Sequence, residues 1–230
     1  MSRPSNRLVA VIAFAASACG RLDMDPPAAP LVFVQDNAVS NGSVGQVTVA
    51  FSVDQVAHDT IVAVVTFESS LQRIVDSSGN HYQMVVGPTN GGTTQQSICV
   101  AADIAAAPAG QNAVTVETMQ SDNISLRVFE YGGLDGIVDV DPTSNRTGSG
   151  TMLDSGTITT TTPDLLFAAT WCNSGIAAGD PAFMQRPLFE TTLVDELVSE
   201  QGDTFHASVT AAGSGDTVIQ LVPFRRTTSR

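Results

Sequence analysis

The chain has 230 residues, of which 43% are hydrophobic and 14% are charged, a balance typical of a folded domain and not of a disordered chain. All ten basic residues are arginine, so no lysine is available as a Schiff-base nucleophile or for an isopeptide crosslink. The formal net charge of −13 repels nucleic acids and anionic lipid headgroups, and we expect no nucleic-acid partner.

Residues 1–18 have the features of a bacterial signal peptide. Arg3 and Arg7 form a positive start, and the apolar run from Leu8 to Ala18 is too short to span a bilayer. The run ends in the small residues Ala16-Ser17-Ala18, which suit signal peptidase. We therefore expect export, and a location in the cell envelope or outside the cell.

Cys19 follows this run directly, and Ala16-Ser17-Ala18-Cys19 resembles a bacterial lipobox, in which the cysteine is lipidated and becomes the new N-terminus. The first lipobox position is usually leucine and is alanine here, and the same residues also suit ordinary cleavage and free secretion. We favour lipidation of Cys19, with residues 19–30 as lipidation site and proline-rich tether. The lipid is then the only contact with a membrane that we expect.

Strand signals dominate the rest of the chain. A first strand is predicted at Leu31–Val34, and a second by the alternation of Val47, Val49, Phe51 and Val53 with smaller or polar neighbours. Similar alternation, or a β-branched run, predicts further strands over residues 61–67, 113–116, 124–128, 156–160, 165–171 and 218–222.

Turn-forming clusters separate these strands. Residues 76–80 lie between apolar runs at 71–75 and 82–86 and predict a hairpin, and residues 87–94, 148–150 and 213–216 predict loops.

Residues 192–200 have helical spacing, but because the neighbouring segments are strands we predict a strand here too. No repeat or change of composition divides residues 31–224. The pattern predicts an all-β chain with one antiparallel, two-sheet β-sandwich over residues 31–224 and a C-terminal tail at 225–230.

Several segments resemble a jelly-roll-like β-sandwich module common in secreted bacterial surface proteins. The resemblance spans roughly residues 61–224, and it implies two packed antiparallel sheets, usually without a catalytic centre. Its motifs are mostly turns and core positions, so it bears on the fold more than on the function. The segments that carry it are residues 74–82, 96–98, 113–116, 128–135, 148–150, 155–156 and 164–166.

The two remaining cysteines, Cys99 and Cys172, could form a disulfide in an exported chain. The bond would close a long loop and contribute about 4 kcal/mol if unstrained. Two buried, unpaired thiols are an equally good interpretation, because spacing along the chain does not give the distance between them.

No motif for catalysis, metal binding or cofactor binding stands out. His58, His81 and His206 are far apart and lack the spacing of metal ligands. No Gly-x-Ser-x-Gly elbow is present, and the glycine-rich residues 87–92 lack the lysine of a phosphate loop. We therefore predict no catalytic residue, no metal and no cofactor.

Two groups of acidic residues offer alternatives to this prediction. Glu117 and Glu130 lie near the ends of consecutive predicted strands, and a facing pair of carboxylates can hydrolyse a glycosidic bond. Asp135, Asp139 and Asp141 lie in a glycine-flanked loop of a kind that calcium prefers, although Pro142 breaks the EF-hand pattern. Surface acids and turn chemistry explain both groups equally well.

These features favour a surface-displayed binding or adhesion module over an enzyme. A polysaccharide or another surface protein is the expected partner, although aromatic residues for a sugar platform are few. The alternative is a structural subunit that self-assembles, with Leu31–Val34 as a donated strand. A glycoside hydrolase using Glu117 and Glu130 is the third hypothesis.

Overall fold

The computed structural model describes residues 29–148, 150–186 and 192–228, with the side chains of residues 192–197 outside that description. The predicted signal peptide and Cys19 lie outside the described residues. The strands are β1 (Val32–Ala50), β2 (Thr60–Phe67), β3 (Leu71–Asp76), β4 (Gln83–Gly91), β5 (Thr94–Ala101), β6 (Ala113–Gly132), β7 (Leu134–Val138), β8 (Thr143–Thr147), β9 (Met152–Asp154), β10 (Ile158–Thr159), β11 (Asp164–Cys172), β12 (Ile176–Ala178), β13 (Met184–Gln185), β14 (Thr192–Val198), β15 (Thr204–Phe205), β16 (Ser208–Ala211) and β17 (Thr217–Arg226).

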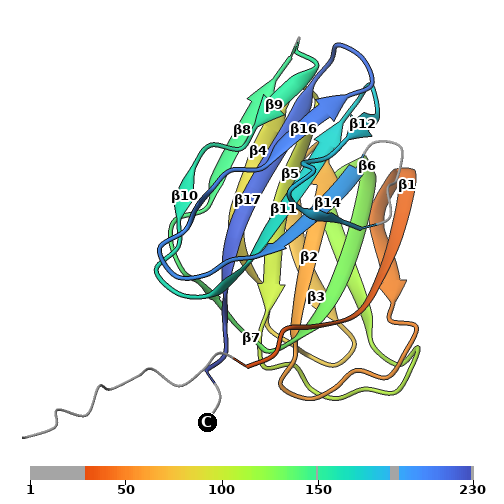
Figure 1. Cartoon of the computed structure of the whole chain (residues 1–230). Coiled ribbons are helices and arrows are strands. Elements are labelled where there is room, and N and C mark those ends of the chain that lie inside the picture. Colours follow the sequence, from red (N-terminus) through yellow and green to blue (C-terminus); the bar gives the residue numbers. More distant parts are fainter. Residues whose placement is uncertain (1–28, 149, 187–191, 229–230) are drawn as a thin grey trace, which may run out of the picture.

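Two six-stranded antiparallel sheets form the body of the molecule (Figure 1). The first sheet has the order β1-β6-β2-β5-β4, with β3 paired to β6, and the second has the order β13-β14-β11-β17-β7, with β8 paired to β17. Smaller sheets of β12-β16-β9 and β10-β15 complete the fold. The predicted all-β, antiparallel sandwich class is confirmed. Within the described part of the chain, no helix is long and apolar enough to cross a membrane.

The sandwich has more layers than the two that the sequence predicts. All eight residues of β2 are buried, because its two faces enter two different cores. Ile61 and Val65 point into a first core, while Val62 and Val64 point the other way into a second core. The strands β11 and β17 do the same between the second core and a third. Strands buried on both faces read as continuous apolar runs, and this is why the sequence shows so little alternation here.

The three cores are numbered from the first sheet toward the small sheets. The first core lies within the folded first sheet and includes Val47, Ile61, Val65, Cys99, Val116 and Leu126. The second core joins the two large sheets and includes Val62, Ile98, Phe129, Tyr131, Phe167 and Phe224. The third core lies under the small sheets and includes Leu153, Leu166, Val209, Ile219 and Leu221.

The first sheet folds over on itself because β1 and β6 bend sharply. Both halves of β6 contribute to the first core, through Val116 in the first half and Leu126 in the second. The side-chain Nδ2 of Asn37 donates to the carbonyl oxygen of Ala50 at 2.7 Å, which links the two halves of β1. The bend lies where the β1–β6 register shifts, and Ser43 there has a φ of +57°. Such a left-handed residue turns the strand without ending it.

Several sequence predictions change at this level. The strands predicted at 31–34 and 46–53 belong to one strand, β1, and those at 113–116 and 124–128 belong to β6. The predicted hairpin across residues 76–80 is wrong, because β3 pairs with β6 while β4 pairs with β5. Residues 87–91 continue β4 instead of forming a loop. The strand predicted in residues 192–200 is confirmed over 192–198, although the apolar residues there have the spacing of a helix.

The two ends of the domain meet at one end of the sandwich. The amide of Ala29 donates to the carbonyl of Thr227 at 2.6 Å, and an Arg226 side-chain nitrogen donates to the carbonyl of Ala29 at 2.7 Å. β17 runs to Arg226, two residues beyond the predicted domain limit. The folded part therefore includes residues that the sequence assigned to tether and tail.

Candidate functional site

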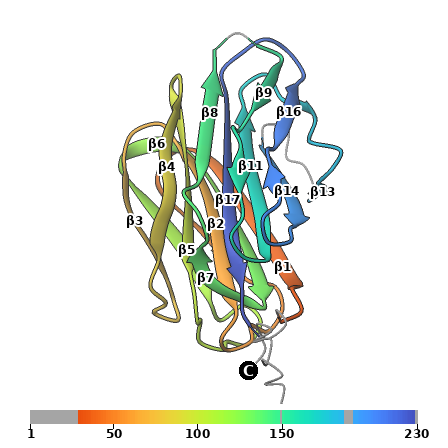
Figure 2. The same cartoon turned by 60° about the vertical axis from the view of Figure 1, so that its left-hand side comes forward.

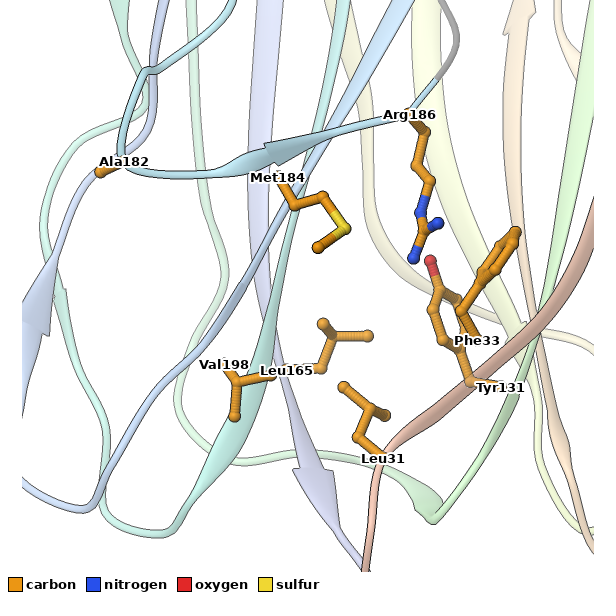
Figure 3. A pocket seen from close by; sticks show the side chains of 8 residues that line it. All are labelled: Leu31, Phe33, Tyr131, Leu165, Ala182, Met184, Arg186 and Val198. Carbon is orange, nitrogen blue, oxygen red and sulfur yellow. The ribbon is translucent and has the colours of Figure 1, made fainter.

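An apolar pocket lies where the edges of the two large sheets approach one another (Figure 3). We call it the edge pocket, and its volume is about 370 Å³. That volume is within the range of small ligand sites. Its lining residues are Leu31, Phe33, Tyr131, Leu165, Ala182, Met184, Arg186 and Val198.

The floor of the edge pocket is continuous with the second core. Tyr131 is fully buried and contacts Phe33 edge-to-face, with ring centroids 5.7 Å apart. Leu165 is 1% exposed and belongs to the same core. Because these side chains are held by core packing, the floor is preformed.

The rim of the pocket is apolar and open to solvent. Met184 is 63% exposed and Val198 is 48% exposed, on β13 and at the end of β14. Large apolar side chains that gather around a hollow are a mark of a binding surface.

Arg186 covers one wall of the edge pocket. Its guanidinium carbon lies 3.5 Å from the centroid of the Phe33 ring, close enough for a cation–π contact. Figure 3 shows the guanidinium group pointing toward the hydroxyl of Tyr131. The face of Phe33 is thus occupied, and it does not offer a flat platform for a sugar ring.

The lining of the edge pocket is mostly apolar. Among the described residues that line it, Tyr131 and Arg186 carry the polar side-chain groups, and none is a carboxylate, histidine, cysteine, serine or threonine. Such a lining can bury an apolar group of a ligand.

Glu117 and Glu130 are not brought together. Both lie on β6, thirteen positions apart, and not on consecutive strands as the sequence suggested. Glu117 forms an ion pair with Arg73 on β3, and this contact lowers its pKa. Glu130 lies near the other end of β6 and is fully buried. The two side chains therefore do not flank a common substrate.

Glu130 holds the loop between β1 and β2 in place through hydrogen bonds. Its carboxylate accepts hydrogen bonds from Gln35 Nε2 at 2.6 Å and from the amide of Val56 at 3.2 Å. The other end of the Gln35 amide, Oε1, accepts from the amides of Ser52 and Val53 at 3.0 and 2.9 Å. The hydrogen bonds of this network account for the burial of the Glu130 carboxylate without a catalytic role.

A second carboxyl lies beside Glu130. Asp59 shares a hydrogen bond with Glu130, and burial raises the pKa of both groups. A buried pair of this kind holds a proton more readily than two solvated acids.

The end of the sandwich at which Ala29 and Thr227 meet is called the loop end. It carries an exposed His58–Asp103 pair. His58 Nδ1 lies 2.6 Å from Asp103 Oδ1, and both residues have left-handed backbone angles, with φ of +74° and +53°. Two hollows of about 520 and 500 Å³ flank the pair, and His81 lines the second. The side chains of His58 and Asp103 are 84% and 79% exposed, so water screens the pair strongly.

Two of the three aspartates considered for calcium, Asp135 and Asp139, accept hydrogen bonds from neighbouring residues, and Asp141 is exposed. Asp135 Oδ1 accepts from the amide of Ile137 at 2.8 Å, while Asp139 accepts from the amide and hydroxyl of Thr161. His206 pairs with Asp154 elsewhere. Within the described part of the chain, no group of three or more His, Cys, Asp or Glu side chains is placed to hold a metal ion.

Cys99 and Cys172 are free, buried thiols, the second of the two interpretations left open by the sequence. Cys99 faces the first core, where burial raises the pKa of its thiol to about 12. The sulfur of Cys172 contacts the hydroxyls of Ser174 and Thr217 at 3.2 and 3.1 Å. Because Cys172 shares its side of β11 with Leu166 of the third core, the second core separates the two sulfurs.

Comparison with known proteins adds no relative. No protein-family model matches the chain, and no curated protein matches it.

The residues of the edge pocket carry no sequence signal. Phe33, Leu165 and Met184 come from distant segments and are ordinary apolar positions in the sequence. Only the pairing of β1, β11 and β13 within two sheets places them together.

Proposed function

We propose that this protein is a non-catalytic binding module of the bacterial cell envelope, anchored through Cys19, with the edge pocket as its binding site. One observation carries the proposal: a preformed apolar hollow of about 370 Å³ whose rim exposes Met184 and Val198. The N-terminal signal features support display outside the cytoplasm.

The chemistry of the edge pocket favours an apolar group over a sugar. Tyr131 is fully buried and Arg186 covers Phe33, so neither ring is open for stacking. An apolar side chain of another surface protein would bury area against Leu31, Leu165 and Met184.

The hollow beside His81 supports polysaccharide binding as the second candidate. Its lining includes the polar side chains of His58, Ser78, Asn80, His81 and Asp103, which can donate to and accept from sugar hydroxyls. Two left-handed non-glycine residues on these loops are the specific observation in its favour, since such strain gathers at binding sites.

Titration with anilinonaphthalene sulfonate, a fluorophore with apolar aromatic rings and one sulfonate group, tests the edge pocket. We expect Met184→Glu to weaken binding about tenfold, because a carboxylate at the rim must lose water when the probe enters and also repels the sulfonate. Met152→Glu is the matched control: Met152 is 72% exposed on β9, which belongs to the small β12-β16-β9 sheet, and it does not line the pocket.

Equal binding by wild type and both variants would contradict the edge pocket as the site. A parallel titration with a panel of polysaccharides separates the second candidate. Sugar binding that His81→Ala abolishes and Met184→Glu leaves intact would place the ligand at the loop end instead.

A further inference from the structure

The outer edge of β1 is unpaired along its whole length. Among the described residues, β1 pairs with β6 alone, and Figure 1 shows it at the margin of the first sheet. The backbone N–H and C=O groups on that side have no strand to bond to within the described chain. An edge of nineteen residues is long for a globular protein.

β1 has few of the features that usually protect an edge strand, although its pairing with β6 shifts register near Phe33 and twice at the bend of residues 41–46. It contains no proline and no lysine or arginine, and Asp36 is its one charged residue. The Asp36 carboxylate accepts from an Arg127 side-chain nitrogen at 2.8 Å, so its charge is matched within the chain.

The other edges differ from β1. β4, at the far side of the same sheet, contains Pro88 and two register shifts, and β13 at the edge of the second sheet has only two residues. Prolines, bulges and short strands each discourage the addition of another strand. Because β1 has register shifts of its own, what distinguishes it is its length and its lack of proline. β3, β7 and β8 also lie at sheet margins, and they have only six, five and five residues.

The part of β1 suited to an added strand is Val32–Asn41. It pairs with the second half of β6 through to Ile124 with one irregularity near Phe33, before the bend at residues 42–45. Apart from Asp36 its side chains are uncharged, and Val32 at its start is 51% exposed.

We propose that a second copy of this chain adds its Val32–Asn41 segment antiparallel to the first across a two-fold axis, which joins two first sheets into one continuous sheet. An antiparallel pair of identical strands is self-complementary, so the same edge serves both partners. The proposal goes beyond ligand binding at the edge pocket and replaces the expectation that Leu31–Val34 is donated to a neighbour, because residues 32–34 are part of β1.

The net negative charge of the chain favours contact at this nearly uncharged edge. It also predicts how the stability of the dimer depends on salt. Each chain has a formal charge of −13, so two copies repel one another over most of their surfaces. The Val32–Asn41 segment is a place where they can meet without placing like charges in contact. Salt screens the remaining repulsion, and the dimer should therefore strengthen as salt rises, opposite to an ion-paired interface.

Sedimentation equilibrium of the purified protein between about 0.05 and about 0.5 M NaCl tests this inference. We expect the mass to shift from monomer to dimer as salt rises, with slower amide exchange in residues 32–41. The double variant Val32→Lys/Asn41→Lys should remain monomeric, because charged side chains on the edge oppose strand addition. The control Ile137→Lys/Met152→Lys adds the same charge at positions that are 51% and 72% exposed on other strands, and should dimerise as wild type does.

A wild-type protein that stays monomeric at high salt would overturn the proposal, as would an edge variant that dimerises like the control. Circular dichroism melting of both double variants identifies any loss of folding. Because probe binding at the edge pocket is measured separately at low salt, failure of the dimer leaves the proposed binding function standing, and the reverse also holds.

Discussion

Buried carboxyl groups show most clearly how single residues set the properties of this protein. Asp164 is fully buried at the start of β11 and accepts a hydrogen bond from the Thr162 hydroxyl at 2.8 Å. Burial raises its pKa to about 7, and the charge of Asp139 acts in the same direction, against the Thr162 hydrogen bond and the charge of Arg225. The folded protein therefore keeps this group protonated at pH values where an unfolded chain ionises it.

The stability of the fold should fall as the pH rises from about 4 to about 7 through Asp164. The unfolded carboxyl loses its proton near pH 3.8, whereas the folded one retains it to about pH 7, and above that pH the loss levels off. The raised pKa values of Glu130 and Asp59 have the same sign.

Asp164→Asn should flatten part of this dependence. We expect its free energy of unfolding, relative to wild type, to be higher at pH 8 than at pH 5, by no more than about 3 kcal/mol, because about two pH units of the effect lie between these values. Urea denaturation at both pH values measures the difference, and Asp141→Asn removes the same formal charge at an exposed position as a control. An identical pH dependence in Asp164→Asn and wild type would contradict the buried, protonated state.

The burial of Glu130 could have been predicted from the sequence. Ile124, Leu126 and Val128 alternate toward the first core, and Glu130 continues the same alternation, so its position predicts burial. Glu117 is on the opposite parity from Val116 and faces outward. The alternation indicates which acid is buried, but it does not give the partners Gln35 and Val56, which come from other segments.

At the level of strands, a buried pair of glutamines links the two large sheets. Gln96 on β5 and Gln220 on β17 are both fully buried. Gln96 Nε2 donates to Gln220 Oε1 at 3.1 Å, and Gln220 Nε2 donates to the Gln96 carbonyl oxygen and to Thr89 Oγ1, both at 2.9 Å. These hydrogen bonds leave only Gln96 Oε1 of the pair without a partner among the described residues, and they connect one sheet to the other inside an apolar core.

Gln220→Leu should therefore destabilise the fold by about 2 kcal/mol, because it removes the hydrogen bonds of Gln220 to the buried Gln96 and to the partly buried Thr89, although Gln96 Nε2 keeps its bond to the Ala169 carbonyl. The midpoint of urea denaturation measures the loss. Gln83→Leu, at an exposed position on β4, is the matched control and should change stability little. Equal midpoints for the two variants would show that the link contributes nothing.

The sequence predicted strands well and their connections poorly. Alternation at Val47 and Val49 and the apolar run of Ile61–Phe67 marked real strands. The residues around Gly42 and Gly45 have turn chemistry, yet they bend β1 instead of ending it, because β6 continues alongside. Pairing of β3 with β6 instead of β4 depends on long-range packing that local patterns do not carry.

At the scale of the whole molecule, both ends of the domain lie at the loop end, as Figures 1 and 2 show. A lipid on Cys19 would therefore attach the domain at the end that carries His58, through residues 19–28, which span at most about 35 Å. The opposite end would then point away from the membrane. The edge pocket lies on the side of the sandwich, between the two sheets, where a partner can reach it from the lateral direction.

The edge pocket is a property of the assembled molecule. Its walls come from strands at both ends of the sequence, and their residues have no composition or spacing that separates them from core positions. The fold class follows from local sequence features, which also predict export, whereas the edge pocket exists only once the two sheets are packed.

A methyl spectrum of methionine-labelled protein tests the edge pocket most directly, because Met184 lines it while Met84, Met119 and Met152 lie outside its lining. On addition of anilinonaphthalene sulfonate, the account predicts a shift of the Met184 methyl resonance with the Met84, Met119 and Met152 resonances unchanged. Probe binding that moves the other methionine resonances and leaves Met184 in place would contradict the edge pocket as the binding site.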